Sequence, residues 1–224
     1  MESLRPAVPH PLRRRAFVAV ALVWAVLLIS AFVQAERSSD MTDERPATGD
    51  YAVVAKAGDL AIEAGELKLW MRLKRSEVIG AYRKSDGELV LPDDWNKSFN
   101  GRTPLEALKK EALSGAIRAK AKQTLAKRFG IDSDYGYRKL SAMLTAENRR
   151  RNEAKSRGEA VYGPLQFEET TYYEYLLSNL DLKLKQALGG LTEPDYASRI
   201  DEAANELQLS LVVDRDVYDA LTAP

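Results

Sequence analysis

The chain has 224 residues, of which 45% are hydrophobic and 29% are charged, and its formal net charge is +0. This length suits one globular domain with an additional segment, and it is sufficient to bury a sizeable core. Because the chain has no cysteine and its single histidine is His10, the residues that follow the N-terminal leader cannot form disulfides, cysteine- or histidine-ligated zinc sites, or a serine-histidine-aspartate triad.

The first 35 residues are typical of a targeting signal. They carry net charge +3, and three consecutive arginines, residues 13–15, stand directly before an uncharged apolar run, residues 16–33. The positive-inside rule predicts that everything after Ala35 is exported. Two outcomes stay open, because Val33-Gln34-Ala35 matches a signal-peptidase site, whereas the length of the run approaches the ~20 residues that span a bilayer. We favour a single-pass anchor in the cytoplasmic membrane over secretion after cleavage following Ala35.

The residues after the leader divide into a tether and a folded domain. Residues 36–50 are polar, as expected of a flexible tether, so the domain is predicted to cover residues 51–224. Two β-prone runs, residues 51–55 and 209–213, lie near the two ends of this domain. Because an isolated strand is not stable, we predict that the two runs pair with each other in a small two-stranded sheet.

Hydrophobic periodicity predicts helices between the two strands. The first covers residues 64–82, and a loop with Trp95 and Phe99 follows it. The second begins at Thr103-Pro104-Leu105-Glu106, a capping box with proline at the first helical position, and ends before Gly130, a left-handed C-cap. Three more helices are predicted, at residues 135–157, 168–188 and 195–207. The expected fold class is therefore mainly α, an irregular helical bundle with a small two-stranded sheet.

Two surface features could bind a partner. A basic cluster occupies residues 149–157, but glutamates alternate with its arginines, which favours a solvated, ion-paired helix. Neighbouring aromatics at residues 167–175 cannot all face one core on a helix of period 3.6, so Tyr172 or Tyr175 should line a groove or its rim. Core packing with an ordinary exposed tyrosine explains the aromatics equally well. The adjacent carboxylates of the sequence do not share a helix face, so no catalytic pair is predicted.

Three segments resemble SurA/PrsA-type extracytoplasmic chaperone-foldases. Residues 54–62, VAKAGDLAI, are similar to the opening A-x-V-N-G-x-x-I-T of that family, although Ala57 replaces the usual asparagine and Glu63 the usual threonine. Residues 105–131 resemble the long core helix that ends in A-K-K-x-G-I, and residues 207–214 resemble the closing strand. The family commonly inserts a parvulin prolyl-isomerase domain before that strand. Here only residues 189–207 precede the strand, which is too short a segment for such a domain. The resemblance therefore implies the chaperone domain without the isomerase.

The sequence thus predicts a protein without enzymatic activity or cofactor that holds unfolded or newly exported polypeptides in an apolar groove outside a bacterial cytoplasmic membrane. The body has net charge −3, which gives no basic excess for nucleic acid. The alternative is a membrane-tethered scaffold that binds one cell-surface partner. A third possibility is a prolyl isomerase, as relatives of this type often are, but we expect no isomerase activity. The predicted peptide-binding residues are Leu69, Trp70, Leu73, Tyr172 and Tyr175.

Overall fold

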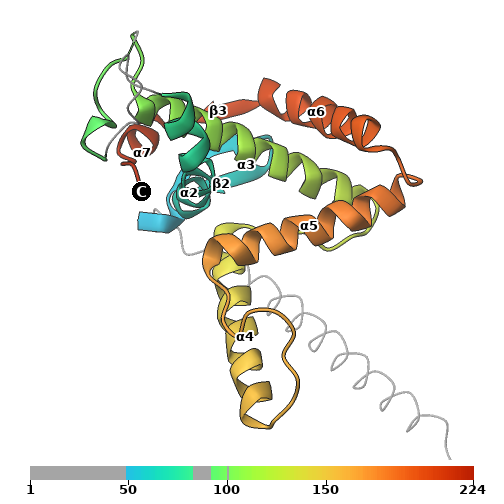
Figure 1. Ribbon diagram of the computed structural model, residues 1–224. Coiled ribbons are helices and arrows are strands. Elements are labelled where there is room, and N and C mark those ends of the chain that lie inside the picture. Colours follow the sequence, from blue (N-terminus) through green and yellow to red (C-terminus); the bar gives the residue numbers. More distant parts are fainter. Residues whose placement is uncertain (1–48, 83–91, 100) are drawn as a thin grey trace, which may run out of the picture. The chain divides into compact units, whose positions relative to one another are not determined.

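The computed structural model describes residues 49–82, 92–99 and 101–224 (Figure 1). All described residues belong to one compact unit, Ala47–Pro224. Within them the structure contains six α-helices and one three-stranded sheet, so the predicted mainly helical class is confirmed. No helix in these ranges is long and apolar enough to cross a membrane, and the predicted span, residues 16–33, lies outside them.

The sheet joins the two ends of the described unit. Strands β1 (Val53–Ala57) and β3 (Leu211–Val213) are antiparallel, with Ala57 opposite Leu211, which confirms the predicted pairing. The sheet has one strand more than predicted, because β2 (Leu60–Glu63) pairs with the other edge of β1. Gly58, with φ +59°, makes the tight turn between β1 and β2. The strand order is β2-β1-β3, so β2 and β3 are edge strands.

The helices follow the predicted boundaries within a few residues. They are α2 (Ala64–Ala81), α3 (Pro104–Arg128), α4 (Tyr137–Ser156), α5 (Glu169–Ala187), α6 (Glu193–Leu209) and the short α7 (Arg215–Asp219), which was not predicted. At the start of α3, Glu106 donates its N–H to Thr103 and its carboxylate accepts from the Thr103 N–H, so the capping box is confirmed. Gly130 ends this helix with φ +68°.

Helix α3 is the central helix and packs against α2, α5 and α6. A β-carbon at Gly115 of α3 would overlap the Trp70 ring, so glycine permits this close packing of α3 on α2. Two apolar clusters result. The first lies under the sheet and includes Val54, Ile62 and Leu108, and the second joins α2 and α3 to α4, α5 and α6.

Helix α4 is packed at its beginning and projects at its end. Leu140, in its first turn, is fully buried in the second apolar cluster. Helix α4 then extends away from α2 and α3, and the chain runs back along it to α5 (Figure 1). We call this projecting part, residues 147–168, the arm.

Candidate functional site

The arm brings together the basic cluster and the aromatic group that the sequence singled out. The second half of α4 is polar and cannot be buried in a core, so it extends from the body of the domain. The chain reverses at Gly158, with φ +74°, and again changes direction at Gly163, with φ +81°, which is followed by Pro164. The segment that returns to α5 therefore lies against α4, and side chains of α4 hold it there.

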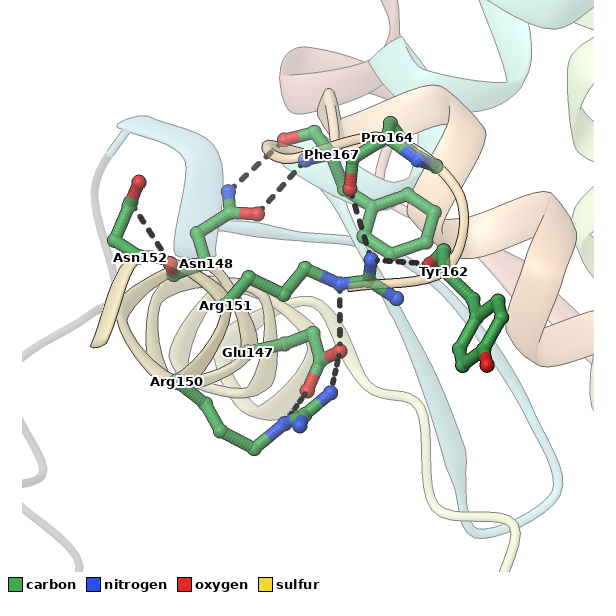
Figure 2. Close-up of polar contacts among 8 residues, drawn as sticks. All are labelled: Glu147, Asn148, Arg150, Arg151, Asn152, Tyr162, Pro164 and Phe167. Carbon is green, nitrogen blue, oxygen red and sulfur yellow. Dashed lines mark hydrogen bonds and ion pairs between the residues drawn. The ribbon is translucent and has the colours of Figure 1, made fainter. Parts of the chain in front are cut away.

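Arg151 fastens the returning segment to α4 (Figure 2). One guanidinium nitrogen, Nη1, donates to the carbonyl oxygens of Tyr162 and Pro164, both at 2.8 Å, and Nε donates to Glu147 at 2.8 Å. The guanidinium carbon also lies 4.4 Å from the centre of the Phe167 ring. Arg151 is only 8% exposed. The expectation of a solvated, ion-paired helix holds here for the ion pair with Glu147 but is wrong for solvation, because the carbonyls of the reversed chain and Glu147 replace water around the guanidinium.

Asn148 fixes the end of the returning segment. Its side-chain oxygen accepts the N–H of Phe167 at 2.8 Å, and its side-chain nitrogen donates to the carbonyl oxygen of the same residue at 2.9 Å (Figure 2). The asparagine amide thus pairs with both the backbone N–H and the backbone C=O of Phe167, as a neighbouring strand would. Phe167 is held in one position directly before α5 begins.

Three aromatic rings meet where the arm joins α5. Phe167 lies 5.4 Å from Tyr172 and 5.6 Å from Tyr175 between ring centres, and its ring is stacked on that of Tyr175 at 29°. Phe167 and Tyr172 are 8% and 6% exposed, whereas Tyr175 is 49% exposed. Tyr162, on the returning segment, is 88% exposed. The junction of the arm and α5 therefore presents a half-exposed ring that rests on two buried ones, and we call Phe167, Tyr172 and Tyr175 the ring platform.

The other arginines of the arm have acidic partners nearby. Arg150 donates two hydrogen bonds to Glu147, at 2.8 and 2.7 Å, and Arg157 pairs with Glu159 at 2.7 Å. Hydrogen bonds from Arg150 and from Arg151 lower the pKa of Glu147 below its ordinary value, so this carboxylate is ionised at neutral pH. Because these arginines are already paired, the arm lacks the array of free cations that a phosphate-binding surface needs.

The five predicted peptide-binding residues are placed in different environments. Leu69 is fully buried and Tyr172 is 6% exposed, so both belong to the second apolar cluster. Trp70 and Leu73 are half-buried and pack against the same cluster, and the Trp70 ring lies edge-on to Tyr173 at 5.9 Å. Only Tyr175 has a large exposed face. The structure brings the rings of Tyr172 and Tyr175 together, whereas Leu69 shares the second cluster with Tyr172 but has no exposed surface. Peptide binding by these residues stays a prediction.

Sequence reasoning missed two residues of the arm. Asn148 and Tyr162 take part in the site only because the chain reverses and brings them together. In the sequence, Gly158 and Gly163-Pro164 were the signals that could have predicted this reversal. Among the residues that the structure describes, no group of three or more histidine, cysteine, aspartate or glutamate side chains is arranged to hold a metal ion.

Comparison with known proteins finds similarity to a protein that is named as a chaperone. The chain is 28% identical over 123 residues to a protein of Bifidobacterium longum subsp. longum named chaperone for lacto-N-biosidase. The match covers 55% of this chain and 44% of the relative, so this chain aligns with less than half of that protein. No family model matches the chain, and no solved structure matches it. The similarity supports a chaperone role, while the resemblance to the SurA/PrsA type stays a prediction.

Proposed function

We propose that this protein is a chaperone that binds the exposed apolar groups of a client polypeptide at the ring platform, where the arm joins α5. The observation that carries this proposal is the half-exposed Tyr175, which is stacked on Phe167 at the junction of the arm and α5. A tyrosine offers a large amphipathic contact area with few rotatable bonds. The relative named as a chaperone supports the same function.

The arm is suited to binding because its surface is fixed before a partner arrives. Arg151 and Asn148 hold the returning segment through four hydrogen bonds, and Phe167 is thereby fixed beneath Tyr175. Little conformational entropy is then lost on binding, which strengthens a contact of small area. Apolar contact is non-directional, so the platform would accept many side chains. The client would leave chemically unchanged.

We place this activity outside the cytoplasmic membrane. The proposal rests on the positive leader and on the apolar run at residues 16–33. Added protease should digest the full-length chain in spheroplasts while a cytoplasmic marker stays intact. Digestion only after lysis would place the protein inside the cell.

Photo-crosslinking tests whether the platform contacts a client. Benzoylphenylalanine replaces Tyr175 in the full-length chain, and reduced, carboxymethylated α-lactalbumin serves as a permanently unfolded probe. A matched control carries the crosslinker at Leu182, which is 61% exposed on the same helix but lies outside the platform. We expect crosslinks at position 175 well above those at position 182. Equal crosslinking yields at the two positions would show that the ring platform is not the binding site.

A second candidate is a dedicated chaperone that serves one client. The name of the relative specifies a single enzyme, lacto-N-biosidase, which favours this possibility. A tagged chain, crosslinked in its own cells, distinguishes the two candidates. One protein recovered in stoichiometric amount indicates a dedicated chaperone or scaffold, whereas many unrelated exported proteins indicate a general one.

A further inference from the structure

A groove lies on the body of the domain, between strand β2, the end of α3 and the residues that lead into α4. It consists of two adjoining cavities of about 520 and 580 Å³. They are lined in common by Asp59, Leu60, Gln123 and Asp134. None of these residues belongs to the arm, so the groove is a separate feature from the ring platform.

One wall of the groove is an edge strand. In the sheet order β2-β1-β3, β2 has β1 as its single strand neighbour, and its residues Leu60, Ala61 and Glu63 line the groove. The outer edge of such a strand presents backbone N–H and C=O groups that a further strand can bind. A polypeptide in the groove would therefore meet hydrogen-bonding groups spaced for a peptide backbone.

The opposite wall supplies a buried polar group without a partner. Gln123 of α3 is 7% exposed, and its side-chain nitrogen Nε2 is buried and makes no hydrogen bond. A buried amide donor that lacks an acceptor is costly, so native structures rarely keep one without a reason. Gln123 lines both cavities, but its Nε2 has almost no accessible surface in the unbound groove, so a ligand satisfies it once the amide turns toward the cavities. A peptide group, which carries a donor and an acceptor, complements a glutamine amide.

The remaining lining fits a neutral chain better than an ion. Leu60, Ile131 and Leu207 give apolar surface. The charges include both signs. Lys127 and Asp132 line the same cavity, and Lys139 lies 3.4 and 3.7 Å from the carboxylates of Asp132 and Asp134. This pairing leaves no concentrated charge that would select a phosphate or a metal ion.

We infer that the groove binds an extended segment of a client polypeptide, which lies along the edge of β2 and accepts a hydrogen bond from Gln123. The inference rests on the proposed chaperone function, since the bound polypeptide is the client. The groove would bind the backbone of the client, whereas the ring platform binds client side chains. Backbone recognition is independent of client sequence, as a chaperone requires.

The test compares two glutamine variants of the full-length chain. Binding of labelled, reduced and carboxymethylated α-lactalbumin is followed by fluorescence anisotropy. Gln123→Leu should weaken binding about fivefold, the effect of one neutral hydrogen bond, whereas Gln186→Leu on the exposed surface of α5 should stay within twofold of the unaltered chain. Hydrogen exchange should also slow in a peptic fragment that contains β2 when the probe binds, and this protection should be lost in Gln123→Leu.

The outcomes separate the inference from the function on which it rests. If Tyr175→Ala weakens binding while Gln123→Leu does not, or if the amides of β2 exchange equally fast with and without the probe, the groove is not a client site and the chaperone proposal stands. If the unaltered chain does not bind the unfolded probe, general client holding fails, and the groove inference fails with it.

Discussion

The carboxylate of Glu66 on α2 lies 2.8 Å from the ammonium nitrogen of Lys120 on α3, and these side chains are 0% and 3% exposed. Tyr173 of α5 lies beside the carboxylate, so three helices converge on one buried charge pair. Removing two ions from water costs several kcal/mol per ion, and their mutual attraction offsets this cost only while both are present. The pair therefore fixes how α2 packs on α3.

Lys120→Met should destabilise the domain by about 3–5 kcal/mol, because it leaves the Glu66 carboxylate buried without a counterion. The double variant Glu66→Leu/Lys120→Met should recover most of this loss, since apolar side chains of similar volume need no compensation. Urea unfolding followed by circular dichroism measures both. A double variant less stable than Lys120→Met would contradict this account of the pair.

Stability should also depend on pH through Glu66. Burial raises its pKa above the ordinary value of 4.5, and Lys120 opposes this shift. The folded state then holds this proton more tightly than the unfolded state, so the stability contributed by Glu66 is complete below pH 4.5 and falls as the pH rises through the folded-state pKa. The difference in free energy of unfolding between the unaltered chain and the double variant should therefore decrease above pH 4.5. A difference that increases would show that the pKa is lowered instead.

Arg151→Ala should release the returning segment of the arm. It removes the two hydrogen bonds from a charged donor to this segment, each worth about 1.5–3 kcal/mol, although water recovers part of this once the segment opens. Hydrogen exchange in residues 159–167 should become faster while α3 keeps its protection. Arg149→Ala is the control, because Arg149 is largely exposed and lies 3.9 Å from Glu153. Equal exchange in the two variants would mean that Arg151 does not hold the segment.

Gln123→Leu should stabilise the unbound protein, even though it should weaken binding. The substitution removes a buried amide donor that has no partner, which is worth about 1–3 kcal/mol, and leucine is of similar size. Thermal unfolding should show a higher midpoint. A lower midpoint would indicate that the Gln123 side chain is satisfied inside the folded domain, and it would argue against a binding role.

Local signals predicted most of the fold. The capping box at Thr103 and the left-handed Gly130 fix the ends of α3 through backbone hydrogen bonds within a few residues, so they can be recognised in the sequence. Strand β2 could not be recognised in this way. It has four residues, stands directly before α2 and is defined by its pairing with β1.

The candidate site was only partly predictable, because exposure depends on packing between distant segments. Periodicity placed Leu69 and Trp70 on a broad apolar surface of α2, but two clusters cover that surface and leave Leu69 fully buried. Charge alternation indicated solvated arginines at residues 149–157, and it could not show that the reversed chain would enclose Arg151. The sequence positions of the aromatic residues predicted that they lie near one another. Their stacking could not be predicted, because it depends on Asn148, which holds Phe167 in place.

The most direct test of client binding at the arm is light scattering from a reduced, aggregating model protein in the presence of the full-length chain. The chain should suppress aggregation in proportion to its concentration, Tyr175→Ala should lose most of this suppression, and Leu182→Ala, at another exposed apolar position of α5, should keep it. Circular dichroism should show equal helicity in all three proteins, because Tyr175 is half-exposed and Leu182 is largely exposed. Full suppression by Tyr175→Ala would contradict the role of the arm, and no suppression by the unaltered chain would contradict general client holding itself.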